Sequence, residues 1–270
     1  GTTIASNGGE DMHILEHGQG QEKTLLFLPC TAEPVWAFEK TVALLAQSWH
    51  VFQVVYDGHE PSYPGDFTSV EQTVDEITDY LRAQGVTCLD AAYGCSLGGS
   101  FVGLLAARGN IRMDYGILGS SDLDQSSKFA AKLQTDLLLP LLFPMLRDGK
   151  FKSRLLQRKM EKRMRERGDY GAAFMRMLGG KRPYLTQQSC KNQFYSDLVT
   201  PLPDKLDVPG TEIHIFYALG MGEKYRARYE QHFAHPVIHE QDMQHEELLA
   251  CHPQEWAALV RSIVGKGAKA

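Results

Sequence analysis

Short apolar runs of strand length alternate along this chain with longer amphipathic segments of helix length. The expected strands are residues 12–16, 24–28, 51–56, 89–92, 115–118, 213–218 and 237–240. Apolar residues at helical spacing predict helices at 36–47, 69–84 and 253–264. Strands that alternate with helices build a mostly parallel sheet with helices on its faces. The sequence therefore predicts an α/β fold class, with a mostly parallel sheet flanked by helices.

One long stretch interrupts this alternation. Residues 123–203 contain no convincing strand and have the pattern of helices, including a strongly apolar part at 129–146. We expect this stretch to be an inserted helical cap, or lid. The core would then consist of residues 1–122 and 204–270.

The cap also contains a basic segment. Residues 147–167 hold ten Lys or Arg residues among three acidic ones, with Leu155, Leu156, Met160 and Met164 on approximately one face. Such a helix can touch acidic lipid or an anionic substrate, but a solvated helix with one packed stripe is commoner. We favour the solvated helix.

A G-x-S-x-G motif lies at residues 94–98, between the expected strand 89–92 and the helix-prone run 101–107. Gly94 and Gly98 lack the Cβ atoms that would keep strand and helix apart. A tight turn of this kind holds its serine in a strained conformation, beside a helix N-terminus that favours negative charge. We expect Ser96 to be a nucleophile.

A serine hydroxyl needs a base to take its proton and an acid to orient that base. In hydrolases with this turn the partners follow along the chain as Ser, then Asp or Glu, then His after the last strand. His245 lies just past the expected strand 237–240 and before the final helix. We expect His245 to be the base.

The acid is open between two positions. Glu223 follows the strand 213–218 on a Gly-rich turn and is the first choice, although it could be an exposed residue in the first turn of a helix. Asp122, directly after the strand 115–118, is the alternative, and Asp124 is a weaker third.

The oxyanion of an acyl-transfer reaction needs backbone N–H donors. One is expected from Leu97, the residue after the nucleophile, and the other from the loop after strand 24–28. Because Pro29 has no N–H, Cys30 or Thr31 must supply the second donor.

These segments resemble the α/β-hydrolase superfamily over nearly the whole chain. The similar segments are 25–31 (strand and oxyanion loop), 56–60 (D-x-x-G-H-G), 94–98 (nucleophile turn), 219–223 (H-G-x-x-D) and 244–246 (histidine loop). Three positions differ from the usual pattern: Pro29-Cys30 replaces His-Gly, Glu223 replaces Asp, and Glu60 replaces Gly. The resemblance implies hydrolysis of esters, amides or related bonds through an acyl-enzyme, without a cofactor. It also implies that His59 packs a loop.

The composition of the chain limits the kinds of partner and cellular location that we expect. A net charge of −5 argues against nucleic acid or an anionic membrane as the main partner. The five cysteines are scattered and form no C-x-x-C pair, which fits reduced thiols in the cytoplasm. No signal-peptide run or membrane-spanning apolar run is visible. His232, His235 and His239 lack metal-ligand spacing, so no metal site is expected.

The sequence therefore predicts a serine hydrolase of the carboxylesterase kind, acting on a small, partly hydrophobic substrate. Ser96 would attack the acyl carbon, His245 would carry the proton, and Glu223 would orient the imidazole. An amidase or a C–C bond hydrolase on the same triad is the alternative. An alternative of another class is a non-catalytic small-molecule-binding protein on the same scaffold.

Overall fold

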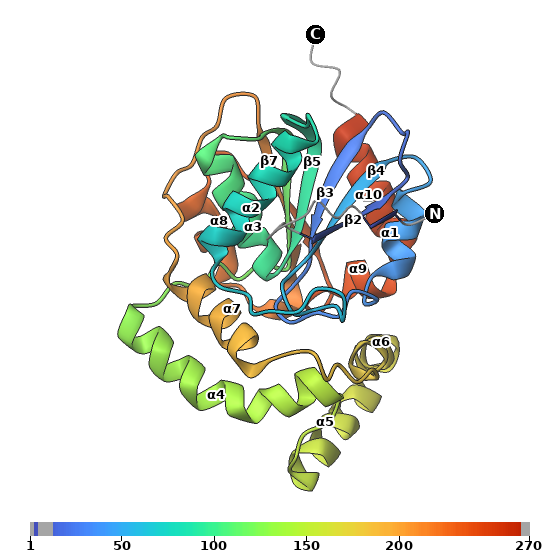
Figure 1. Ribbon diagram of the computed structural model, residues 1–270, viewed down its shortest axis with the longest axis vertical. Coiled ribbons are helices and arrows are strands. Elements are labelled where there is room, and N and C mark those ends of the chain that lie inside the picture. The colour runs from blue at the N-terminus through green and yellow to red at the C-terminus, as the bar shows by residue number, and fades with distance from the viewer. Residues whose placement is uncertain (1–2, 5–12, 266–270) are drawn as a thin grey trace.

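The computed structural model describes residues 3–4 and 13–265, and its strands form one sheet of eight (Figure 1). The strand order is β1-β2-β4-β3-β5-β6-β7-β8. The strands are β1 (Thr3–Ile4), β2 (His13–His17), β3 (Thr24–Leu28), β4 (His50–Val55), β5 (Cys88–Cys95), β6 (Arg112–Gly119), β7 (Glu212–Ala218) and β8 (Val237–Gln241). The pairs β1–β2 and β2–β4 are antiparallel and all others are parallel, so the predicted fold class is confirmed.

The sequence-based strands fall on seven of these elements. Met12, expected to open the first of them, lies outside the described residues, and the rest of that run belongs to β2. The two-residue strand β1 was not predicted, because a run that short carries no periodic signal.

Helices cover both faces of the sheet (Figure 1). One face carries α2 (Val70–Ala83), α3 (Leu97–Arg108) and α8 (Tyr225–His232), and the other carries α1 (Glu39–Leu45), α9 (Glu247–Cys251) and α10 (Pro253–Gly265). The central strand β3 shows why two layers are needed. Leu26 and Leu28 pack in the hydrophobic cluster of the first face, while Leu25 and Phe27 pack in that of the second. Because successive side chains point to opposite faces, a strand apolar at every position must be covered twice.

Between β6 and β7 the chain leaves the sheet in a helical segment, residues 123–203, which is called the cap below (Figure 1). The cap carries α4 (Lys128–Asp148), α5 (Arg154–Glu166), α6 (Gly168–Leu178) and α7 (Gln187–Val199), and no strand. On α4, Leu139 and Phe143 are buried in one small cluster with Ala32 of the core. The cap is therefore attached to the loop that follows β3.

The first turn of α3 lies almost in contact with the end of β3. A Cβ atom added at Gly98 would lie 2.2 Å from the carbonyl oxygen of Leu28. One added at Gly94 would lie 1.9 Å from the carbonyl oxygen of Gly98. Real Cβ atoms do not approach backbone this closely, so both positions require glycine.

We predict that Gly98→Ala lowers stability by at least about 3 kcal/mol, because the new methyl group must displace backbone on both elements. Thermal unfolding should show a melting temperature lower by roughly 10 °C. The matched control is Gly179→Ala, since a Cβ atom there would have no neighbour nearer than 3.4 Å. Equal melting temperatures for the two variants would contradict the close contact between Gly98 and the Leu28 carbonyl.

Candidate active site

Ser96 occupies the junction between β5 and α3 with φ 52° and ψ −108°. This backbone region is strained for any residue with a Cβ atom. Two hydrogen bonds hold it there. The Ser96 N–H donates to the Gly119 carbonyl at 2.8 Å, and the Ser121 hydroxyl donates to the Ser96 carbonyl at 2.8 Å. The serine is therefore fixed by the neighbouring strand β6 as well as by its own turn.

Backbone strain gathers around this serine. Six non-glycine residues in the described part of the chain have positive φ, and all except Lys205 lie in loops that follow the carboxyl ends of parallel strands. The five are Ala32, Ser96, Ser120, Leu123 and Glu246. Each such conformation costs of order 1–3 kcal/mol, and it persists only where the surroundings impose it. The strain thus marks this edge of the sheet as the candidate site without reference to any motif.

His245 lies in the loop between β8 and α9, with its side chain 40% exposed. The next residue, Glu246, anchors this loop, because its N–H donates to the Ser120 hydroxyl at 2.8 Å. In the described residues no hydrogen bond joins Ser96 to His245. Bonds between nucleophile and base are often long before substrate binds, so this geometry is compatible with a base at His245.

Asp122 directly follows the end of β6 and shares electrostatic contact with His245. Burial raises the pKa of Asp122, while the Asp124 N–H at 2.8 Å and the charges of His245 and Arg228 act in the opposite direction. Arg228 also fixes this loop, since it donates to the Asp122 carbonyl at 2.5 Å and pairs with the Asp124 carboxylate. Asp122 is thus a half-buried carboxyl group on a loop that Arg228 holds in place.

Glu223 lies elsewhere. It is exposed between η1 (Leu219–Met221) and α8, where its charge acts on Tyr217. No hydrogen bond or ion pair of Glu223 with His245 occurs in the described part of the chain. Asp122 is therefore the candidate acid on which the charge of His245 acts, while Glu223 is exposed.

The expected oxyanion donors differ in whether their N–H groups already form a hydrogen bond. Leu97 is the first residue of α3, so its N–H has no partner within the helix. The Cys30 N–H already donates to the Glu33 carboxylate at 2.9 Å. The Thr31 N–H has no hydrogen bond to any described residue. Of the three expected donors, Leu97 and Thr31 therefore have no hydrogen-bond partner among the described residues.

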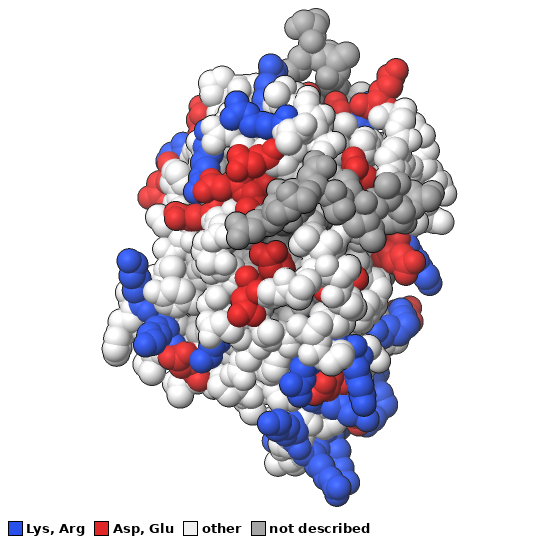
Figure 2. Space-filling view, viewed as in Figure 1, with Lys and Arg blue, Asp and Glu red and all other residues white. Residues whose placement is uncertain are grey.

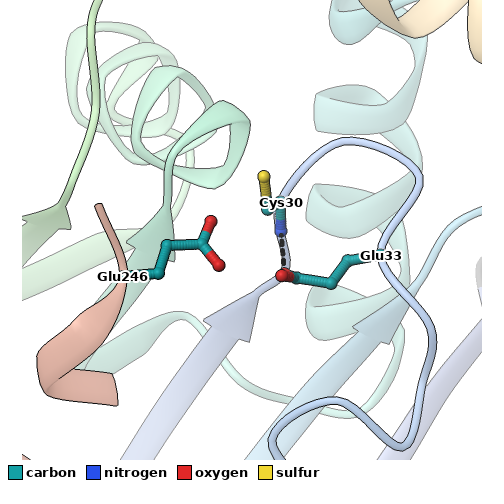
Figure 3. A group of neighbouring side chains, drawn as sticks. All are labelled: Cys30, Glu33 and Glu246. Atoms are coloured by element: carbon teal, nitrogen blue, oxygen red, sulfur yellow. Dashed lines mark hydrogen bonds between the residues drawn. The ribbon is translucent and has the colours of Figure 1, made fainter. Parts of the chain in front are cut away.

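A thiol and two carboxyl groups meet beside the serine (Figure 3). Cys30 and Glu33 come from the loop after β3, Glu246 comes from the histidine loop, and their polar atoms lie within 4.8 Å of one another. Burial, the charge of Glu246 and a hydrogen bond with it hold the pKa of Glu33 well above its usual range. Two carboxyl groups this close disfavour the ionised form of Glu33.

These are the described residues that could hold a metal ion, which the sequence did not predict. A thiol binds a metal only as the thiolate. Burial and the charges of Glu246 and Glu33 raise the pKa of Cys30, while a hydrogen bond with the Ser96 side chain opposes the shift. The thiol is therefore held protonated, and the group is best described as a hydrogen-bonded cluster that packs the oxyanion loop against the histidine loop.

A cavity of about 160 Å³ opens beside this cluster. Its wall includes His245, Glu246 and Thr31 from the core. The cap contributes apolar side chains from the end of α4 and from α6: Met145, Leu146, Ala173, Phe174, Met177 and Leu178. A larger hollow of about 460 Å³ between α1 and α6 shares Ala173 and Met177 with it. The cavity that contains the candidate base is thus mostly apolar and is roofed by the cap.

Comparison with solved structures identifies the fold. A solved α/β-hydrolase family protein from Desulfitobacterium hafniense superposes with a TM-score of 0.72 at 17% identity, over 93% of this chain and 99% of that one. The chain has the α/β-hydrolase fold. A thermophilic esterase from Thermogutta terrifontis gives a TM-score of 0.69 at 15% identity, covering 98% of both chains. The enol-lactonase from Burkholderia xenovorans gives 0.66 at 14% identity, over 97% of this chain and 98% of that one. No protein-family model matches the chain, and no curated protein matches its sequence.

The sequence did not predict one carboxyl group near the candidate acid, that of Asp197. Asp197 on α7 of the cap contacts the core through a hydrogen bond with Ser100 on α3. Burial, together with the charges of Asp122 and Asp124, raises the pKa of Asp197 to about 7. The cap therefore places a third carboxyl group against the loop that carries the candidate acid.

A raised carboxyl pKa makes stability depend on pH. Below about pH 4 Asp197 is neutral in both states, and between about pH 4 and 7 only the unfolded chain ionises it, so stability is lost as pH rises. We predict that Asp197→Asn matches the wild type near pH 4 and melts several degrees higher above pH 7. Melting curves across pH measure this, with Asp79→Asn on the exposed side of α2 as the control. A rise in the melting temperature of Asp197→Asn that is the same at every pH would contradict the raised pKa of Asp197.

Proposed function

We propose that this protein is a serine hydrolase that cleaves an ester or a related acyl bond through an acyl-enzyme. The observation that carries the proposal is the strained turn at Ser96. Ser96 and His245 both follow the carboxyl ends of parallel strands, and the backbone N–H groups of Leu97 and Thr31 are unpaired among the described residues. A nucleophile, a base and an oxyanion site are the minimum that acyl transfer requires.

The proposed reaction has two halves. Ser96 attacks the acyl carbon while His245 takes its proton, and the Leu97 and Thr31 N–H groups stabilise the negative charge on the acyl oxygen. His245 then returns the proton to the leaving group, and an activated water releases the acyl group in the reverse sense. Asp122 orients the imidazole and stabilises its positive charge, in place of Glu223.

The cavity supports a small substrate with an apolar part. Its volume of about 160 Å³ admits only a short group, and most of its wall on the cap side is apolar. The esterase and the enol-lactonase with the same fold are named for ester and lactone substrates. An ester is therefore the bond that we propose, with an amide or a C–C bond as the alternative on the same groups.

The cysteines support a reducing compartment. All five are free thiols, and Cys95 and Cys190 are buried. Proteins of oxidising compartments that contain several cysteines usually pair them. We propose a cytoplasmic location on this basis.

A fluorophosphonate probe tests the nucleophile. It should label the wild-type protein at Ser96, because the probe reacts with an activated serine, and labelling should vanish in Ser96→Ala. Hydrolysis of an activated ester should fall by roughly 10³-fold or more in the same variant. The control is Ser262→Ala on the exposed side of α10. A folded wild-type protein that takes no label would favour the non-catalytic binding protein instead.

Two matched substitutions test the acid. Asp122→Asn should lower kcat by roughly 10²- to 10⁴-fold, because it removes the charge that faces the imidazolium. Glu223→Gln should leave kcat within about twofold, because this side chain lies in solvent. Steady-state rates on an activated ester measure both. The opposite ranking would assign the role to Glu223.

A further inference from the structure

The cap exposes an apolar face on its longest helix. Five large side chains of α4 are between 47% and 80% exposed: Phe129, Leu133, Leu137, Leu138 and Leu141. Their spacing places them on one side of the helix, and the opposite side packs against α7 and the core. Next to them a shallow hollow of about 60 Å³, lined by Leu138, Leu142, Phe194 and Leu198, continues the apolar surface. A contiguous apolar surface of this kind marks an interaction site.

The cap segment that follows α4 is positively charged. Residues 147–167 carry ten Lys or Arg residues and three acidic ones, a net charge of +7 in a chain whose total is −5, so the remaining residues carry −12. The helix α5 has no buried residue, and Leu155 on it is also 63% exposed. Within the described chain, none of the Lys and Arg residues at 150–165 forms an ion pair. Figure 2 shows Lys and Arg gathered at this end of the molecule, and Figure 1 places α4 and α5 together there.

The charge decides which partner fits. A symmetric contact between two copies would bring +7 against +7, which is unfavourable. A partner with negative charge at its surface and an apolar interior would fit the basic residues of α5 and the apolar side chains of α4. An anionic lipid bilayer has both properties. The cytoplasmic leaflet carries this charge, which agrees with the free cysteines.

The helix α4 is also long and apolar enough, by length and composition alone, to cross a membrane. Its contacts favour a different arrangement. It contains Lys132 and Asp136, and Asp136 pairs with Lys191 of α7 at 3.2 Å. A helix with one face packed on the protein and the other face apolar is suited to lie in the membrane surface.

We propose that the cap docks the protein on an anionic lipid surface, with the exposed side chains of α4 inserted and the basic residues of α5 against the headgroups. The last turns of α4 supply Met145 and Leu146 to the substrate cavity, so the docking helix and the cavity wall are one element. The proposal does not depend on the proposed chemistry, because no candidate catalytic residue lies on α4 or α5.

Co-sedimentation with vesicles tests it. The full-length protein should bind phosphatidylcholine vesicles that contain about one third phosphatidylserine, and bind pure phosphatidylcholine at least tenfold more weakly. Binding should weaken as salt is raised, because the headgroup contacts are screened.

Matched variants separate the two contributions. Leu137→Gln with Leu141→Gln should weaken vesicle binding at least tenfold, whereas Val237→Gln, also at an exposed apolar side chain but on β8, should not. Lys159→Glu with Lys162→Glu should remove the preference for phosphatidylserine, whereas Lys40→Glu with Lys224→Glu should keep it. Unchanged melting temperatures show that the variants fold.

Two results would overturn the proposal. One is wild-type protein that fails to bind the anionic vesicles, or that binds both vesicle types equally. The other is a dimer, seen by light scattering, that dissociates in the Leu137→Gln, Leu141→Gln variant while vesicle binding is unaffected. That second result would assign the face to another copy of the chain. Fluorophosphonate labelling of Ser96 in the same variants is a separate readout, so failure of docking and failure of the proposed hydrolase are distinguishable.

Discussion

The whole site depends on the contact between the first turn of α3 and the end of β3. Gly98 lies against the Leu28 carbonyl so closely that no side chain fits between them. The loop after Leu28 carries Thr31, and the turn before Gly98 carries Ser96 and the Leu97 N–H. One packing contact therefore joins the two segments that carry the proposed oxyanion donors. Hydrogen bonds from Ser121 to Ser96 and from Glu246 to Ser120 then tie the neighbouring loops to the same point.

The features that could be predicted from the sequence are those with a local cause. The apolar run at β3 and the glycines around Ser96 each carry their own signal, and Ser69 caps α2 through the Gln72 N–H as its spacing suggests. The relation between His245 and an acid is not local, because Asp122 and Glu223 both follow strand ends and only the course of each loop separates them. Asp197 could not be identified as part of the site, since it lies on a cap helix whose contact with α3 no sequence period encodes. The positive φ angles that flank the site also had no signal, because Ala32 and Leu123 are residue types that rarely adopt them.

Total charge was a poor guide to the surface of this molecule. The value of −5 is a sum over a strongly basic cap segment and a strongly acidic remainder, and a partner meets only the face in front of it. In the stripe on the basic segment, Leu156, Met160 and Met164 are half-buried and Leu155 is exposed, so α5 contributes no residue to the core. The apolar run at 129–146 divides its side chains between a packed face and solvent.

The cap enters and leaves the sheet between β6 and β7, which are adjacent and parallel with Gly116 opposite Ile213. The two ends of the cap, residues 123–203, meet beside the core, where the Ser126 N–H donates to the Leu198 carbonyl at 2.8 Å. Ser96, Asp122 and His245 all lie on the core side of that point. Recombination or engineering could exchange the whole insertion for another, and so change substrate range and membrane targeting together, without altering the register of a single strand.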